Sequence, residues 1–171
     1  MKIDMSKVTP VRLMKGDNDK DTSLLSEMFD DASTYITSFA WCAGILESYF
    51  GLGVGGVVAV FLFKIRPAAK EIDDWLWVVV GDLPSAYLVT DNAPNPACAL
   101  EAYIDEMEEW VKAAISGRSV DALIPVNVNP TLANAQSLKK RLNFLSSKIL
   151  NYYTEDPNYR RVEIGDNQSG K

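Results

Sequence analysis

The chain has 171 residues, of which 47% are hydrophobic and 23% are charged, and its formal net charge is −6. These values are typical of one globular domain and exclude wholesale disorder. The sequence contains no histidine, which excludes the Ser-His-Asp and Cys-His catalytic systems and every His-ligated metal site. The acidic balance argues against nucleic acid and against a membrane surface as partners, because both are bound by clustered Lys and Arg.

Neither a secretory leader nor a membrane span is expected. Residues 1–21 are polar and irregular, without the apolar run and cleavage site of a signal peptide. The most apolar stretch, residues 48–63, is shorter than the about 20 residues that a spanning helix requires, and Glu47 and Lys64 bound it closely. Two cysteines are too few for a disulfide scaffold. These features predict a cytoplasmic protein.

The first half of the chain predicts one helix and then a sheet. Apolar residues recur every three or four positions from residue 22 to about residue 39, with Asp21, Thr22 or Ser23 as the expected helix cap. Runs rich in β-branched and aromatic residues then predict strands at 57–65, 75–80 and 86–90, with a fourth at 45–52. Their short connections favour antiparallel neighbours, and such apolar strands predict a sheet covered on both faces.

Two helices are predicted after the sheet. Residues 96–117 form an amphipathic stripe that Asn95 caps and Gly117 ends, and a second helix starts after Thr131. The predicted fold class is α+β, with an antiparallel three- or four-stranded sheet preceded by one helix and followed by two packed helices. The predicted organisation is an irregular N-terminal segment at 1–21, a single domain at 22–153 and a polar C-terminal tail at 154–171.

Two short motifs invite a ligand interpretation. Residues 51–56 match the glycine pattern G-x-G-x-x-G, but a dinucleotide site needs a helix after this loop, and residues 57–65 predict a strand. A hairpin turn, or a close approach of another backbone, is the favoured interpretation. Asp17, Asp19 and Asp21 resemble the opening of a calcium loop, yet Thr22 and Met28 stand where that loop requires Gly and Glu. We therefore expect neither a metal ion nor a cofactor.

Aromatic residues near the predicted sheet could line a small-molecule pocket. Trp75 and Trp77 share one face of a strand, and indoles with an N–H to satisfy often mark ligand or partner sites. The candidate pocket comprises Trp75, Trp77 and Tyr87, with Asp82 as an acid or base. The alternative is that the tryptophans pack in the core and that Asp82 hydrogen-bonds its own turn.

Charge is unevenly distributed along the chain. Residues 67–117 carry ten acidic and two basic residues, whereas residues 118–171 carry eight basic and five acidic ones. Like charges stand four positions apart in the 96–117 helix, which destabilises a helix slightly, and Lys112 is expected to relieve them through Glu108. One explanation is intramolecular, with Lys139, Lys140 and Arg141 lying nearby. The other is a basic partner surface, for which the candidate contacts are Glu101, Asp105, Glu108 and Glu109.

Three sequence strings are similar to those of a protein family. They are W-L-W-V-V-V-G-D-L-P-S-A-Y-L at residues 75–88, A-L-x-A-Y-I-x-x-M-x-x-W-V at 99–111 and I-P-V-N at 124–127. Together they resemble an uncharacterised family of small bacterial proteins over residues 39–150. The resemblance supplies no functional residues, and small acidic families of this kind resemble the immunity proteins of polymorphic toxin systems.

The leading expectation is a non-enzymatic cytosolic binding protein, most concretely an immunity protein that occludes a toxin domain with a basic surface. It follows from the lack of a catalytic constellation together with the acidic helix face. The alternatives are a small-molecule enzyme or sensor that uses the Trp/Tyr pocket, and a structural adaptor that oligomerises through its apolar sheet. The sequence leaves the oligomeric state and the partner's identity open.

Overall fold

The computed structural model describes residues 2–155 of this chain. The regular elements are β1 (Thr9–Pro10), α1 (Asp19–Thr37), β2 (Cys42–Val54), β3 (Val58–Pro67), β4 (Trp75–Gly81), β5 (Ala86–Val89), α2 (Pro96–Ser116) and α3 (Leu132–Phe144). Short 3-10 turns at Met5–Lys7 (η1) and Val11–Leu13 (η2) flank β1. At the other end, α3 continues through a π-helical segment (Leu145–Leu150, η3) into α4 (Asn151–Glu155).

The sheet is an antiparallel meander whose strands lie in chain order, from β1 to β5. The α+β class with an antiparallel sheet is therefore confirmed. The predicted count of three or four strands is wrong, because Thr9 and Pro10 pair with Phe50 and Tyr49 and add a fifth strand. This strand precedes α1, so the first helix follows the start of the sheet. A proline in it is compatible with the sheet because an edge strand needs no ladder donor on its outer side.

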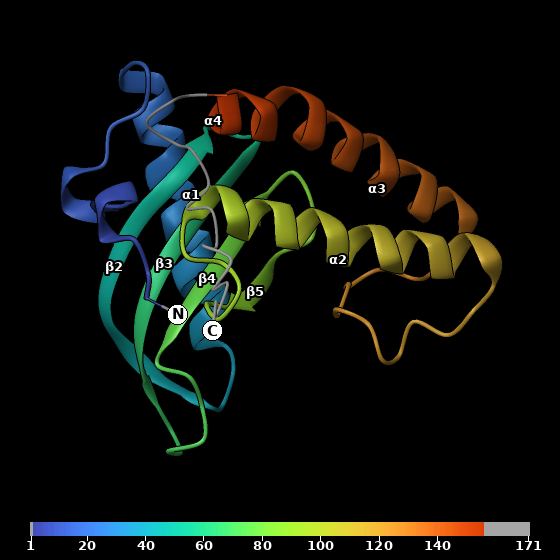
Figure 1. The fold of residues 1–171 in the computed structure, drawn as a ribbon, viewed down its shortest axis with the longest axis horizontal. Helices are drawn as coiled ribbons and strands as arrows, with labels where there is room; N and C mark the ends of the chain where they lie inside the picture. The colour runs from blue at the N-terminus through green and yellow to red at the C-terminus, as the bar shows by residue number, and fades with distance from the viewer. Residues whose placement is uncertain (1, 156–171) are drawn as a thin grey trace, which may run out of the picture.

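Three layers are stacked in the fold, with the sheet in the middle (Figure 1). The α1 helix covers one face, α2 covers the other, and α3 packs along α2. The central strand β3 has side chains buried on both faces: Val58, Val60 and Leu62 lie in the core beneath α2, whereas Phe61 and Phe63 lie in the core beneath α1. The expectation that both faces are covered is confirmed, and it explains why this strand is apolar at successive positions.

The helices begin and end at residues suited to those positions. Asn18 caps α1 by accepting a hydrogen bond from the backbone N–H of Asp21, so the helix starts earlier than the predicted caps at 21–23. For α2 the predicted signals are confirmed: Asn95 caps it, and Gly117, at φ 69°, ends it. In Figure 1, α2 and α3 run antiparallel and extend together past β5.

The glycine-rich segment at 51–56 forms the end of β2 and the β2–β3 turn, and β3 follows it directly. A Cβ on Gly51 would lie 2.7 Å from the Pro96 ring, so glycine here lets α2 approach the sheet. The hairpin interpretation of this motif is confirmed. Asp21 holds the turn to α1, because its Oδ1 accepts a 2.7 Å hydrogen bond from the Gly55 N–H.

Candidate functional site

The candidate partner-binding acids lie along α2. Asp105 and Glu109 are exposed, and Glu101 and Glu108 are partly exposed, while the opposite side of the helix is buried against the sheet and α3. Lys112 Nζ lies 2.9 Å from Glu109 Oε1, so this lysine pairs with Glu109 in place of the expected Glu108. The hydrogen bond and the positive charge of Lys112 lower the pKa of the Glu109 carboxyl.

Basic residues of α3 were one expected source of intramolecular neutralisation for these acids. Arg141 takes a different partner: its Nε lies 3.4 Å from Asp82 Oδ2, in the turn between β4 and β5. Its guanidinium also donates a 2.6 Å hydrogen bond to the Ser137 hydroxyl. Arg141 therefore connects α3 to the sheet, and its charge is directed to Asp82.

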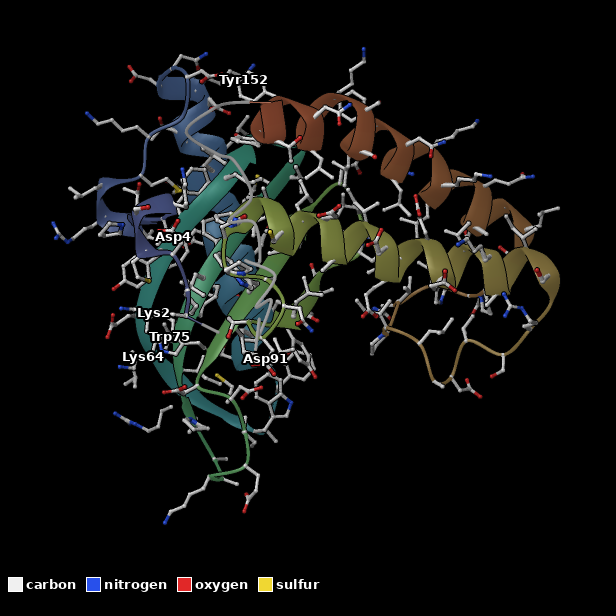
Figure 2. The ribbon with its side chains drawn as sticks, viewed as in Figure 1. Lys2, Asp4, Lys64, Trp75, Asp91 and Tyr152 are labelled. Carbon is white, nitrogen blue, oxygen red and sulfur yellow. The ribbon has the colours of Figure 1, made fainter. Side chains whose placement is uncertain are left out.

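The four residues of the predicted pocket do not share one cavity. Trp77 is fully buried beneath α2, and its indole N–H donates a 2.8 Å hydrogen bond to the Ala93 carbonyl. Trp75 lies on the same face of the sheet as Trp77, and Lys64 Nζ is 5.6 Å from its ring centre (Figure 2). Tyr87 points to the opposite face of the sheet, where its ring contacts aromatic residues on the α1 side. Asp82 lies in the exposed β4–β5 turn. The core-packing interpretation holds for Trp77.

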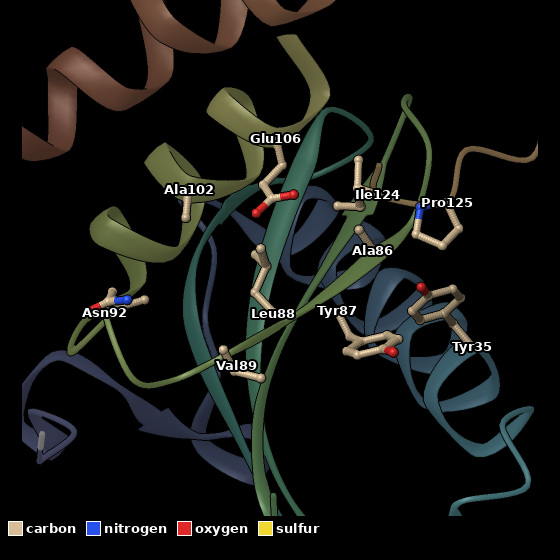
Figure 3. A pocket seen from close by; sticks show the side chains of 11 residues that line it. Tyr35, Ala86, Tyr87, Leu88, Val89, Asn92, Ala102, Glu106, Ile124 and Pro125 are labelled. Atoms are coloured by element: carbon tan, nitrogen blue, oxygen red, sulfur yellow. The ribbon is translucent and has the colours of Figure 1, made fainter. Parts of the chain in front are cut away.

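A cleft of about 300 Å³ lies beside β5 (Figure 3). Its walls come from three segments: the C-terminal half of α1, the strand and loop after β4, and the α2 helix with the 117–131 connection. Figure 3 shows Glu106 reaching down from α2 toward Leu88, with Tyr35 and Tyr87 on the far side of the strand. The lining residues are Tyr35, Ala86, Tyr87, Leu88, Val89, Asn92, Ala93, Ala102, Glu106, Ile124 and Pro125.

Four aromatic rings gather where α1 meets β5. Phe39 stacks on Trp41 at 5.0 Å between ring centres, and both contact Tyr87 edge-on at 5.2 and 5.0 Å. Tyr35 joins the cluster through Phe39. Burial raises the pKa of the Tyr35 phenol to about 12, and a hydrogen bond with the Tyr87 backbone opposes part of that rise. The phenol oxygen of Tyr35 therefore lies against the backbone of the edge strand.

A second cleft of about 300 Å³ lies on the α1 side of the same strand end. It is lined by Trp41, Glu71, Ile72, Asp73, Leu76, Tyr87 and Val89. Tyr87 and Val89 thus border both clefts, and the side chains of both are exposed, by 36% and 47%. A third cleft, near the Asp82–Arg141 pair, is separate from these two.

Sequence reasoning did not select most residues of the two clefts. Tyr35 belongs to the predicted first helix, and Glu106 flanks the candidate acidic stripe on α2. Ala102 and Glu106 are four residues apart, so helical spacing predicts that they lie on one face of α2. The joining of this stripe with Ile124 and Tyr35 depends on contacts between distant segments, for which the sequence carries no local signal.

Within residues 2–155, no buried side-chain nitrogen or oxygen lacks a hydrogen-bond partner. The same part of the chain holds no cluster of three or more Cys, Asp or Glu side chains arranged to bind a metal. Its helices are also too short or too polar to cross a membrane. Comparison with family models, curated proteins and solved structures finds no match to this chain.

Proposed function

We propose that this protein is a non-enzymatic, cytosolic protein-binding domain, most concretely an immunity protein that neutralises a toxin by direct binding. The observation that carries the proposal is the acidic outer side of α2, formed by Glu101, Asp105, Glu108 and Glu109. These residues stand on a helix whose buried side packs against the sheet and α3. The proposed partner is a protein domain with a basic surface.

Electrostatics supports this choice of surface. Asp105 is flanked at four-residue spacing by Glu101 and Glu109, and like-charge pairs of this kind cost a helix about 0.2–0.5 kcal/mol each. Only exposed side chains keep such charges hydrated at this small cost. A concentrated field on one helix accelerates encounter with an oppositely charged partner, and salt weakens that effect.

An immunity protein acts by occluding a toxin site, so it requires no catalytic residues of its own. This is compatible with a chain that lacks histidine.

Charge reversal tests the proposal with a matched control. The variant Asp105→Lys/Glu108→Lys/Glu109→Lys reverses three charges on α2, and Glu27→Lys/Asp30→Lys/Asp31→Lys reverses three exposed charges on α1. Both variants have the same net charge, so only the location differs. The probe is the protein encoded next to this chain in the native host, and its association rate is measured by stopped flow at several salt concentrations.

We expect the α2 variant to slow association by about tenfold or more at low salt, and much less at high salt. The α1 variant retains most of the rate. Equal effects of the two variants would show that only net charge matters and would remove the α2 assignment. Co-purification of a small molecule in place of a protein would favour the enzyme or sensor alternative.

A further inference from the structure

Within the described residues 2–155, no strand pairs with the outer edge of β5, because the sheet order ends at this strand. The hydrogen bonds between β3 and β4 determine which residues of β5 bond to β4 and which direct their backbone groups outward. The Ile65 N–H donates to the Asp74 carbonyl at 2.8 Å, which fixes the alternation between β3 and β4. The same alternation continues into the pairing of β4 with β5, where Ala86 and Leu88 are the β5 residues that hydrogen-bond to β4. Tyr87 and Val89 therefore direct their backbone N–H and C=O groups outward.

The opposite edge of the sheet is unsuited to accept another strand. β1 covers β2 only at Tyr49 and Phe50, and the remainder of β2 is interrupted by register shifts between Cys42 and Ile45 and between Ile45 and Glu47. Bulges of this kind twist an edge and break its regular row of donors and acceptors. The β4–β5 pairing has a continuous register, so β5 offers the regular edge.

The surroundings of the β5 edge supply side-chain sites on both faces. One cleft lies on the α2 side and the other on the α1 side, and both include Tyr87 and Val89. Successive side chains of an added strand would point alternately to these two faces. An incoming strand would therefore place one set of side chains toward Glu106 and the next toward Glu71 and Asp73.

Every charged residue that lines either cleft is acidic: Glu106 on the α2 side, and Glu71 and Asp73 on the α1 side. Asp91, two residues beyond Val89, adds a further exposed carboxylate. Charge complementarity therefore selects a basic occupant. A second copy paired through its own β5 would bring the same acidic groups together and is disfavoured by like-charge repulsion.

We propose that the outer edge of β5 binds an extended, basic segment of a protein partner as an additional strand. Backbone hydrogen bonds at Tyr87 and Val89 supply the pairing, and Arg or Lys side chains contact the carboxylates of the two clefts. Because these carboxylates lie on opposite faces, the two basic residues of the segment are separated by an odd number of positions. This inference rests on the proposed protein-binding function and adds a surface distinct from the acidic side of α2.

Tyr35 has a definite place in this mode of binding. Its phenol contacts the Tyr87 backbone in the free protein, so the incoming strand replaces that contact. The edge groups of Val89 are the new partners that the segment gains. The Val89 amide is accordingly the most informative reporter of binding.

Synthetic peptides provide the test. The panel consists of capped peptides of about eight residues built from Thr, Ser and Val, with two arginines three positions apart or, at the same composition, four positions apart. A third peptide carries Glu at the odd spacing. Binding to the full chain is followed by amide chemical shifts and by hydrogen exchange of the Val89 N–H.

We expect the odd-spaced Arg peptide to bind and to slow exchange at Val89. The even-spaced peptide binds about threefold more weakly, because one surface ion pair is lost, and the Glu peptide does not bind. Val89→Pro removes only an outward N–H, which an edge strand tolerates, and weakens binding by about tenfold or more. Val89→Ala keeps that N–H and serves as the matched control, with circular dichroism confirming that both variants fold.

Four results would overturn the proposal. The first is that no peptide slows hydrogen exchange of the Val89 N–H, and the second is that Val89→Pro and Val89→Ala bind the peptide equally well. The third is that this amide is already protected in the free monomer, and the fourth is that the free protein dimerises through the β5 edge. The third result assigns the edge to the chain's own residues and the fourth to a second copy. The two proposals fail separately. Loss of partner binding in the α2 charge variant but not in Val89→Pro contradicts the edge site alone, whereas the reverse result contradicts the α2 surface alone.

Discussion

The indole N–H of Trp77 donates a 2.8 Å hydrogen bond to the carbonyl oxygen of Ala93, and this contact joins the middle of the sheet to the loop before α2. Both residues are buried, with 0% and 2% of their surface exposed. The same loop accepts a hydrogen bond at the Pro94 carbonyl from the Asp4 N–H. The polar end of this tryptophan is therefore satisfied within the core, where it fixes the loop that leads into α2.

Replacing Trp77 tests this structural role. Trp77→Phe leaves the Ala93 carbonyl without its donor and opens space beneath α2, so we expect a loss of about 2–4 kcal/mol in the free energy of unfolding. Trp75→Phe changes a half-buried ring on the same strand and is expected to cost less than about 1 kcal/mol. Urea denaturation measures both. Equal costs would show that the Ala93 contact contributes nothing specific.

Local sequence patterns are sufficient to predict β3, β4 and α2, because each combines a long apolar or amphipathic run with clear turn or cap residues. The shorter β5 is predicted from its β-branched and aromatic residues after the Gly81–Pro84 turn. Such patterns could not predict β1, whose two residues carry no periodicity and pair only through their position beside Tyr49 and Phe50. The acidic side of α2 was predictable from helical spacing. The pairing of Arg141 with Asp82 was not, because it joins residues 59 positions apart in the sequence. The cleft at β5 likewise depends on how three separate segments are arranged.

Alkaline pH is expected to destabilise the fold through buried phenols. Burial raises the pKa of Tyr35 to about 12, and it raises the pKa of Tyr103, whose hydroxyl donates a 2.6 Å hydrogen bond to the Pro84 carbonyl. A phenol in the unfolded chain ionises near pH 10. The stabilisation from each neutral phenol is therefore fully present below about pH 10 and is lost as the pH rises through the folded value.

Ultraviolet absorbance and urea unfolding between about pH 8 and 12 check this expectation. Tyr35 and Tyr103 should ionise at higher pH than phenols of the unfolded chain, and the free energy of unfolding should fall over the same range. Tyr103→Phe is less stable at neutral pH, because the Pro84 carbonyl loses its partner, but its stability should fall less steeply above pH 10. An unchanged slope in this variant would mean that Tyr103 has the same pKa in the folded and unfolded chain.

Asp21 is expected to contribute more to stability than its neighbours in the first turn of α1. Its two carboxylate oxygens accept hydrogen bonds from the backbone N–H groups of Gly55 and Asp17, at 2.7 and 2.9 Å. Asp21→Ala leaves the partly buried Gly55 N–H without a partner, at a cost of about 1–3 kcal/mol. Asp19→Ala removes an exposed acid from the same turn and should cost about 0.3–1 kcal/mol through the helix dipole. Thermal or urea unfolding separates the two, and similar losses would assign both to the dipole.

The close approach of α2 to β2 gives the last prediction. A Cβ at residue 51 would lie 2.7 Å from the Pro96 ring and 2.9 Å from the Val60 carbonyl oxygen, so Gly51→Ala forces α2 away from the sheet. We expect overpacking to cost about 1–3 kcal/mol. Pro96→Gly removes one of the two obstructing groups and relieves part of that cost. A double-mutant cycle in urea should therefore give a favourable coupling of about 0.5 kcal/mol or more between the two substitutions. Strict additivity would show that the Val60 carbonyl, and not α2, limits the size of residue 51.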